Sequence, residues 1–403
     1  MRVAESYVYL DWAATAPLSQ EAYDAMQPYL APGRENVSFG MNANSLHTPG
    51  RNAFSALEDA RVRLARAVGA QRPTEIVFTS GATEADNAAI LGIIDARVHE
   101  ERQRGNADYV PHFVTSAIEH EAVLTLIPLL RERGCEVDVV KPNRAGFVTP
   151  DALRECLRPN TTLVSLMWAN NETGAIQDVK AAAQAAHEVG ALFHTDATQA
   201  FGKTAVDVKA AGVDAASFSA HKVGGPKGVG ALYLRTKTPF TPFLLGGGQE
   251  QGRRSGTQNV AGVVGFAAAA DALLSIREEE QTRLAGLRDR LYEDLRAEGL
   301  AHPSVPEACG SDGYLPNIAS LIVPGIESET LILQLDLAGF ALSGGSACST
   351  GSLEPSHVLS ALGIPRDEAL CSLRVSMGRY TTAEDIDRFV VAFKDIVSRG
   401  AAR

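Results

Sequence analysis

Cysteine is scarce in this sequence, and its few copies are scattered. No Cys-x-x-Cys pair occurs, and the five cysteines in 403 residues are Cys135, Cys156, Cys309, Cys348 and Cys371. A structural zinc site needs closely spaced cysteines, so a zinc knuckle is not expected, nor any resident metal. Because an odd, sparse set of thiols fits a reducing compartment, we expect a cytoplasmic protein with at least one thiol free for chemistry.

Long apolar runs and blocks of one charge are also missing. The longest apolar stretches, such as Ala261–Leu274, are too short and too rich in alanine to cross a bilayer. Residues 1–11 lack the basic and apolar segments of a secretion signal. The net charge is −11, from 37 basic and 48 acidic residues, without a basic block. We therefore expect neither membrane attachment nor general affinity for nucleic acid.

The composition is that of a globular protein with a large core. Apolar residues make up 45% and charged residues of mixed sign 21%, which argues against disorder. Between about residues 53 and 235, helical patterns (54–68, 84–98 and 180–189) alternate with short apolar segments. This order predicts a mostly parallel sheet with helices on both faces. The expected strands are 75–79, 113–116, 162–168, 191–195, 215–219 and 230–234.

After Gly246–Gly248 the pattern changes. One long helical pattern covers roughly residues 260–297, and short strands are expected at 318–322 and 373–376. Thr381 or Thr382, with an acidic residue three positions later, predicts a capping box before a final helix. We therefore expect an α/β protein with a large domain over residues 21–261 and a smaller α+β domain formed by residues 1–20 and 262–403.

The most informative segment is Ser219–Gly228, in which a lysine follows a short apolar strand and precedes a glycine-rich turn. Such a turn can hold an amine beside a bound phosphate. Asp196 ends another predicted strand, where the active-site loops of α/β sheets emerge. Lys222 and Asp196 together suggest pyridoxal phosphate, bound to the lysine as a Schiff base, with the carboxylate facing the pyridine nitrogen. A loop cap is the plain alternative for Asp196.

A second segment has the features of a phosphate site. Thr79–Glu84 follows a predicted strand and opens a predicted helix, where free N–H groups and the helix dipole favour an anion. Thr83 adds a hydroxyl donor, although taken alone it is better explained as an ordinary N-cap. Ser219 and His221, next to Lys222, are further candidate phosphate donors.

Two more side chains suit a flat aromatic cofactor. His120 follows the strand expected at 113–116, and it could stack on a ring and move protons near neutral pH. A histidine buried in the core is an equally good explanation. Gln199 could donate to the ring oxygen, with a solvated surface position as the alternative.

One thiol is a further candidate for the site. Cys348 lies in Ser343–Ser352, a segment of small and polar residues unsuited to a core. We expect a mobile loop there, which suits a thiolate nucleophile that must visit two places. Arg374 is a candidate ligand for a substrate carboxylate. A surface ion pair is its alternative.

The chain closely resembles the cysteine desulfurases of the NifS/IscS type, pyridoxal phosphate enzymes of the class V aminotransferase group. The resemblance covers nearly the full length. Each motif is weak alone, but the ordered set is specific. The matches are Tyr9–Thr15, Asn42–His47, Phe78–Glu84, Asn170–Gly174, His194–Gln199, Ser219–Lys222, Arg254–Thr257, Gly345–Cys348 and Leu353–Ser356.

The resemblance implies fold type I of the pyridoxal phosphate enzymes and a reaction that takes sulfur from L-cysteine and releases L-alanine. Lys222 resembles the Schiff-base lysine, His120 the acid–base stacked on the ring, and Cys348 the nucleophile that becomes a persulfide. Further cofactor contacts are implied for Ala82, Thr83, Asn171, Asp196, Gln199, Ser219, His221 and Thr257. Asn171 and Arg374 are implied to bind the substrate carboxylate.

The resemblance also implies partners. Thr257 resembles a phosphate ligand lent by the neighbouring subunit, which implies a homodimer with composite sites. The segment Cys348–Pro355 is similar to a long-loop subgroup that hands sulfur directly to an acceptor protein such as an iron–sulfur scaffold. Relatives of the IscS branch carry a longer C-terminal tail that helps that docking, so the end of the sequence at Arg403 leaves the docking mode open. Whether Cys348 ever ligates a cluster in transit is open too.

Two other classes of function remain. Another class V enzyme, such as a selenocysteine lyase, a kynureninase-like hydrolase or an aminotransferase, would share the lysine and the aspartate but have less use for a loop cysteine. A non-catalytic sulfur carrier would keep the fold without the chemistry. Intact Lys222, Asp196 and His120 argue against it.

Overall fold

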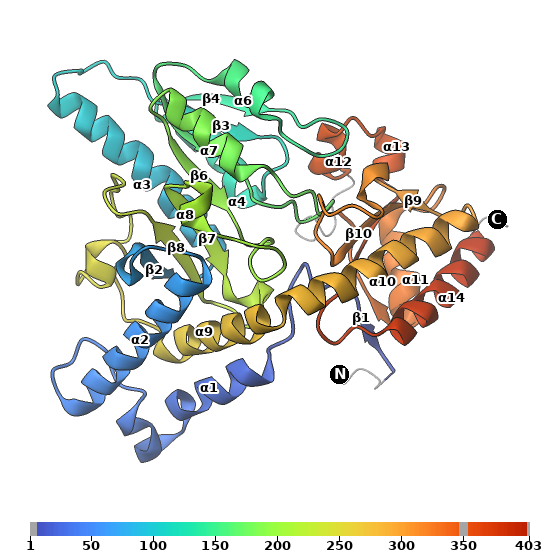
Figure 1. Cartoon of the computed structure of the whole chain (residues 1–403), viewed down its shortest axis with the longest axis horizontal. Helices are drawn as coiled ribbons and strands as arrows, with labels where there is room; N and C mark the ends of the chain where they lie inside the picture. The colour runs from blue at the N-terminus through green and yellow to red at the C-terminus, as the bar shows by residue number, and fades with distance from the viewer. Residues whose placement is uncertain (1–5, 346–353, 401–403) are drawn as a thin grey trace.

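A seven-stranded sheet forms the centre of the protein, whose computed structural model describes residues 6–345 and 354–400 (Figure 1). The strand order is β2-β8-β7-β6-β5-β3-β4, and only β8 runs antiparallel to its neighbours. This arrangement confirms the predicted mostly parallel sheet. The strands are β2 (Ile76–Thr79), β3 (His112–Ser116), β4 (Glu136–Val140), β5 (Thr161–Ser165), β6 (Leu192–Asp196), β7 (Ala215–Ser219) and β8 (Gly230–Leu234).

Helices cover both faces of this sheet, because alternate strand residues point to opposite sides. Val77 and Phe113 pack in one apolar cluster with α3 (Ala82–Gln103), whereas Phe78 and Val114 pack in another with α2 (Thr48–Ala67) and α7 (Val179–Glu188). The central strands β5, β6 and β7 are buried along almost their whole length, although Ser, Thr, His and Asp interrupt their apolar residues. The remaining helices of this part are α1 (Gln20–Leu30), α4 (Glu121–Leu124), α5 (Leu126–Glu132), α6 (Pro150–Cys156) and α8 (Val208–Ala211).

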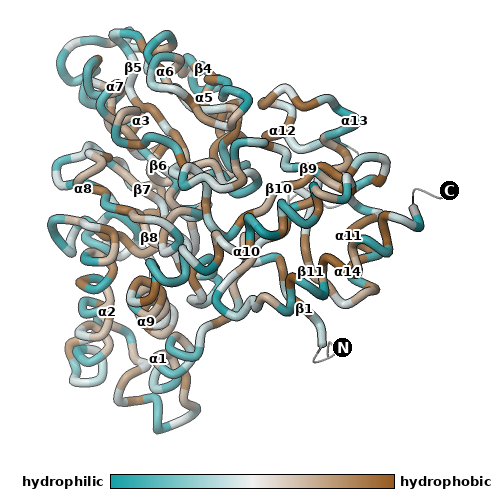
Figure 2. The backbone as a smooth tube through the Cα atoms, turned by 45° about the vertical axis from the view of Figure 1, so that its right-hand side comes forward, coloured by the Kyte–Doolittle hydropathy of each residue, from teal (hydrophilic) through white to brown (hydrophobic). Residues whose placement is uncertain are grey.

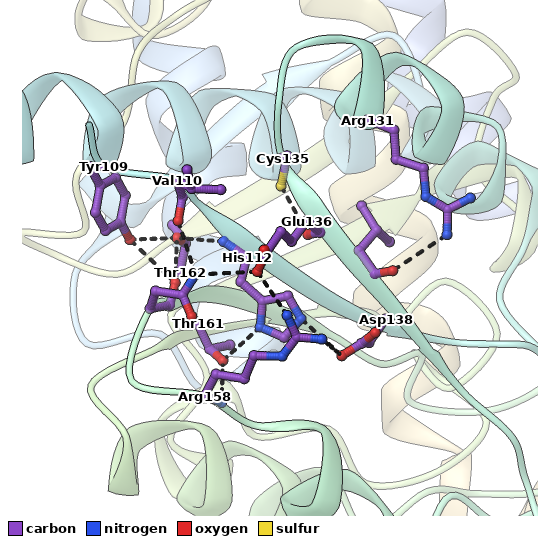
Figure 3. Close-up of polar contacts among 12 residues, drawn as sticks. Tyr109, Val110, His112, Arg131, Cys135, Glu136, Asp138, Arg158, Thr161 and Thr162 are labelled. Carbon is purple, nitrogen blue, oxygen red and sulfur yellow. Dashed lines mark hydrogen bonds and ion pairs between the residues drawn. The ribbon is translucent and has the colours of Figure 1, made fainter. Parts of the chain in front are cut away.

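The edge strand β4 is missing from the sequence prediction, and its surroundings explain why. Its residues are mostly exposed or half-buried, so it lacks an apolar signature. Arg158 donates to Glu136 at 2.7 Å and to Asp138 at 2.5 Å, and the buried His112 on β3 lies 3.2 Å from the same Asp138 carboxylate (Figure 3). Ion pairs from the neighbouring chain segments therefore hold this edge, in place of apolar burial.

The helical pattern predicted over 260–297 is two helices, not one. α9 (Val260–Ser275) and α10 (Arg277–Ala297) meet at Ile276 with a bend of 71°. The apolar α9 packs against α1 and α2, and α10 runs on toward the C-terminal part of the chain (Figures 1 and 2). Within the described residues no single helix is long and apolar enough to cross a membrane, and this bent pair passes only by length and composition.

The C-terminal part contains two small sheets. β12 (Ser372–Ser376), β10 (Ile318–Ile322) and β9 (His302–Pro303) are antiparallel, and β1 (Val8–Tyr9) pairs in parallel with β11 (Phe340–Ala341). The helices here are α11 (Ser328–Leu337), α12 (His357–Ala361), α13 (Arg366–Ala369) and α14 (Ala383–Gly400). Thr382 and Asp385 form the predicted capping box, with each side chain accepting from the other's backbone N–H. The division of the chain at residue 261 stays a prediction, and it would cut α9.

Gly286 offers a test of how α10 is stabilised. It lies inside this helix, and a Cβ built there would meet nothing within 4 Å. We expect Gly286→Ala to raise the free energy of unfolding by about 0.5–1 kcal/mol, since alanine loses less backbone entropy on folding. Urea denaturation measures the change.

Gly363 provides the matched control. A Cβ there also meets nothing within 4 Å, but its φ is +79°. Gly363→Ala should therefore destabilise by about 1 kcal/mol through backbone strain. Equal effects of the two substitutions would contradict this explanation.

Candidate active site

A cavity of about 480 Å³ lies where the carboxyl ends of β6 and β7 meet the N-terminus of α3. Loops at this edge of a parallel sheet form the usual ligand site of α/β proteins. Ten of the twelve residues predicted for the site line this cavity: Ala82, Thr83, His120, Asn171, Asp196, Gln199, Ser219, His221, Lys222 and Arg374. Segments from both ends of the sequence, including Ala13–Thr15 and Arg374, complete the wall.

Lys222 sits on a tight turn that follows β7. Its Nζ donates to the carbonyl oxygens of Ala13 at 2.7 Å and Ala14 at 2.8 Å. The turn requires glycine at position 225, because a Cβ there would come within 2.9 Å of the Ala220 Cβ. The backbone on both sides of Lys222 is thus fixed, and its amine is held at the wall of the cavity.

Asp196 ends β6, and the residue is 7% exposed. Its Oδ1 accepts from the Thr198 N–H at 2.9 Å, so the carboxylate does cap its own loop while it faces the cavity. Gln199 is buried, and its Nε2 donates to the Ala13 carbonyl at 2.9 Å. The Gln199 Oε1 is buried without a hydrogen-bond partner among the described residues. A solvated surface position is therefore wrong for Gln199.

The opposite end of the cavity is built from helix α3 and the Lys222 turn. The N-cap of α3 is Gly81, so Thr83 does not cap its own helix. Glu84 accepts from the Ser80 N–H at 2.8 Å and pairs with Arg254 at 2.8 Å. These contacts fix the first turn of α3, and the cavity lies against it.

His221 has an unusual electrostatic environment. Its Nδ1 lies 2.6 Å from the Thr15 hydroxyl. Burial, followed by the positive charges of Lys222, Lys227 and Lys203, lowers the pKa of His221 to about 4. A cluster of positive groups around a neutral imidazole is suited to an anion, whose charge would oppose this shift.

His120 forms the N-cap of α4, and its Nδ1 accepts from the Ala122 N–H at 3.1 Å. In the neutral ring the proton is therefore on Nε2. The side chain is half-buried and lines the cavity. His120 is thus fixed by its own helix and is not a core histidine.

Arg374 lies on β12, and it is 1% exposed. Its guanidinium donates to Asp11 Oδ1 at 3.0 Å, to the Ser343 hydroxyl at 2.8 Å and to the Asn171 carbonyl at 2.9 Å. A surface ion pair is therefore wrong for this residue. The Arg374 Nε is buried without a hydrogen-bond partner among the described residues. Sequence reasoning named Asp11 only within a motif and missed Ser343 as its neighbour.

Two predicted residues are not in this group. Thr257 is exposed and does not line the cavity of its own chain. Cys348 lies outside the described residues. Among the described residues, no group of three or more histidines, cysteines or acidic residues could hold a metal ion.

Two buried carboxyl groups lie at or beside the cavity, and sequence reasoning did not find them: Asp86, which lines it, and Glu119, which precedes the lining residue His120. Burial and the nearby Asp196 raise the pKa of Asp86 well above its usual range. Burial also raises the pKa of Glu119 to about 8, although hydrogen bonds from Ser116 and the Met167 N–H oppose the shift. Asp86 stands among polar residues at the start of α3 and Glu119 in the loop after β3, so neither position carries a sequence signal of burial.

Glu119→Gln should reveal this burial as a pH dependence. The folded-state pKa of Glu119 is raised from 4.5 to about 8, so the unfolded chain releases this proton first as the pH rises. Stability is therefore lost between these two values, by up to a few kcal/mol. We expect Glu119→Gln to gain stability relative to the parent over this range and to keep a constant difference at higher pH.

Denaturation at a series of pH values measures the difference between the two proteins. His194 and Asp86 are common to both, so their own titrations largely cancel. A difference that stays constant from pH 4.5 to 8 would contradict the raised pKa of Glu119.

The fold and this site define a class of protein. Residues 8–389 match the model of the class V aminotransferase family. The chain belongs to that family, whose enzymes use pyridoxal phosphate.

Relatives specify the class further. The chain is 41% identical over 393 residues to the cysteine desulfurase IscS of Dictyoglomus turgidum, covering 97% of this chain and 95% of the relative. It is 40% identical to the cysteine desulfurase NifS of Azotobacter vinelandii, covering 97% and 93%. Among solved structures, a NifS-like protein superposes with a TM-score of 0.86 at 34% identity, covering 98% of this chain and 100% of that one. These similarities confirm the resemblance and the fold predicted from the sequence motifs.

Proposed function

We propose that this protein is a cysteine desulfurase that takes sulfur from L-cysteine, releases L-alanine and keeps the sulfur as a persulfide on Cys348. The observation that carries the proposal is the convergence of Lys222, Asp196 and Arg374 on one cavity. In the overall reaction the substrate C–S bond breaks and an S–S bond forms. One thiol hydrogen passes to the β-carbon and the other stays on the persulfide, so no outside oxidant is needed.

The residues of the cavity fit pyridoxal phosphate. Lys222 would bond the cofactor covalently, Asp196 would face its pyridine nitrogen and Gln199 would face its ring oxygen. Gln199 is buried at the cavity, with Nε2 donating to the Ala13 carbonyl and Oε1 without a partner among the described residues, so donation to the ring oxygen would require its amide to turn over. When bound, the cofactor supplies an electron sink for reactions at the substrate amino acid.

The phosphate would lie at the N-terminus of α3. Helix N-termini bind anions through free N–H groups and the helix dipole. Thr83, Ser219 and His221 would add side-chain donors, with Ala82 contributing backbone. The positive charges of Lys222, Lys227 and Lys203, which add to burial in lowering the pKa of His221, would also attract a phosphate, and they support this assignment.

Substrate contacts and proton transfer would come from three residues. The Arg374 Nε, buried without a partner among the described residues, would bind the substrate carboxylate, with Asn171 beside it. His120 would hold or release a proton at Nε2, since its Nδ1 is engaged by the Ala122 N–H. The Lys222 amine would act as the second proton carrier.

The described residue Gly345 supports the assignment of Cys348 as the nucleophile. Gly345 lies against Glu172, which lines the cavity, and Cys348 follows Gly345 by three residues in the sequence. A thiol there would form the covalent persulfide that the proposed reaction needs.

A homodimer is part of the proposal. Thr257 is exposed, and its neighbour Gln258 accepts from Asn44 at 2.9 Å. Large apolar side chains in the two segments joined by this contact are exposed: Leu30, Val37, Phe39, Leu46, Phe54, Phe243, Leu244 and Leu245. A second copy covering them would bring Thr257 to its partner's phosphate.

The sulfur acceptor, such as an iron–sulfur scaffold, and the cytoplasmic location stay predictions.

One assay tests the proposed function. Purified protein loaded with pyridoxal phosphate is mixed with L-cysteine and a reductant, and alanine and sulfide are measured. Equal amounts of both are expected. A keto acid product, or alanine formation with no dependence on Cys348, would instead favour an aminotransferase or another class V enzyme. A protein that stays colourless with the cofactor would favour a non-catalytic sulfur carrier.

A further inference from the structure

Glu172 is a buried carboxyl group at the rim of the cavity with no role in the site described so far. It lies in the turn Asn170–Gly174 after β5, and it is 1% exposed. The Ser356 hydroxyl donates to its Oε2 at 2.5 Å. Gly345 approaches the same oxygen so closely that a Cβ at that position would lie 2.4 Å from it. That Cβ would also lie 3.3 Å from the Ser356 Cβ.

Gly345 and Ser356 flank the segment that carries Cys348 on its two sides. Gly345 and Ser356 therefore both contact the carboxyl group of Glu172 in the turn after β5, although Ser356 is 184 residues from Glu172 in the sequence. We propose that Glu172 is a positioning residue, which holds the base of the Cys348 segment against the cavity through Gly345 and Ser356. These three residues are called the Glu172 clamp. The inference rests on the proposed role of Cys348.

Neighbouring contacts tie the clamp to the substrate site. Before Gly345, the Ser343 hydroxyl accepts from Arg374 at 2.8 Å and donates to Asp11 at 3.0 Å. After Ser356, the His357 ring lies 2.9 Å from the Glu119 carbonyl. The chain on each side of the Cys348 segment is thus attached to residues that line the cavity or adjoin it.

The surroundings of Glu172 raise its pKa on balance, chiefly through burial. Burial raises the pKa of Glu172, whereas the Ser356 hydroxyl and the charges of His357 and Arg374 lower it, and Glu121 raises it again. Glutamine retains an acceptor oxygen of similar reach, so Glu172→Gln separates the hydrogen bond from the charge. Alanine removes both.

Ser356 has a second role that the test must separate. Its Oγ also accepts from the Leu359 N–H at 3.2 Å as the N-cap of α12. Thr149 is a matched control, because its hydroxyl caps α6 by accepting from the Ala152 N–H at 3.2 Å and touches no part of the clamp. Gly286 is the corresponding control for Gly345, since a Cβ there meets nothing within 4 Å.

The experiment compares Ser356→Ala, Gly345→Ala and Glu172→Ala with Thr149→Ala and Gly286→Ala, all as holoenzymes. Rapid mixing with L-cysteine separates the colour change on substrate binding from persulfide formation on Cys348, followed by mass spectrometry. The three clamp variants should bind cofactor and substrate normally and form persulfide about 10- to 100-fold more slowly, because small misplacements of reacting groups cost this much. Glu172→Gln should recover most of the rate, and the controls should match the parent.

A second measurement does not depend on the reaction. Hydrogen exchange of the amides at 342–345 and 356–360 should become at least about tenfold faster in Ser356→Ala and Gly345→Ala than in the two controls. Without the clamp, the two ends of the Cys348 segment are no longer held in place. Failure of the proposed function would leave this result standing. Unchanged exchange together with an unchanged persulfide rate would overturn the clamp. The clamp would also be overturned if Ser356→Ala and Thr149→Ala slowed every step of the reaction alike, because the loss of a helix cap would then explain the effect.

Discussion

Lys222→Ala should abolish sulfur release from L-cysteine and the yellow colour of the cofactor-loaded protein. The variant loses the amine that would bond the cofactor and the group that would carry a proton during the reaction. Loss of one positioned acid–base group costs about 10²- to 10⁴-fold, and loss of covalent attachment adds to that. We expect activity at least about 10⁴-fold below the parent.

Borohydride reduction followed by peptide mass spectrometry checks this assignment directly. The parent should carry the reduced cofactor on Lys222 and the variant should carry none. Lys209→Ala, an exposed lysine at the end of α8, is the control and should keep both colour and adduct. An adduct on any other lysine of the parent protein would overturn the site as a whole.

The fold was predictable wherever burial leaves a clear pattern. Strands β7 and β8 were predicted with their observed bounds, because every residue in both is buried. The edge strand β4 was missed, since polar contacts from Arg158 replace apolar burial there. The break between α9 and α10 was missed because neither Gly nor Pro stands at Ile276. Packing of α9 against α1 and α2 sets its direction, and that contact is not visible in the local sequence.

The site was predictable for residues that strand ends and glycine turns bring together. Asp196 and Lys222 belong to this group, because parallel strands deliver their carboxyl ends to one edge of the sheet. The sequence identified Arg374 as a candidate ligand for the substrate carboxylate. Only the structure showed that Arg374 is buried, which excludes the alternative of a surface ion pair. Glu172 and Ser356 could not be paired from sequence, since a single hydrogen bond between distant segments leaves no local pattern.

Cys348→Ala should leave the cofactor chemistry intact and remove sulfur transfer. The variant should stay yellow and still change colour with L-cysteine, because Lys222, Asp196 and Arg374 are unaltered. Persulfide on the enzyme should vanish, and alanine and sulfide should fall at least about 10³-fold, as expected when a covalent nucleophile is lost. This split between binding and turnover distinguishes a nucleophile from a structural thiol.

The remaining cysteines are poor substitutes for it. Burial raises the pKa of Cys135 to about 12 and raises the pKa values of Cys156 and Cys309, so these thiols resist forming the reactive thiolate. None of them lines the cavity, nor does the buried Cys371. Cys309→Ala is therefore the matched control and should retain the parent rate. Desulfuration by Cys348→Ala at the parent rate would show that another group accepts the sulfur, and the persulfide assignment would have to be abandoned while the cofactor site stood.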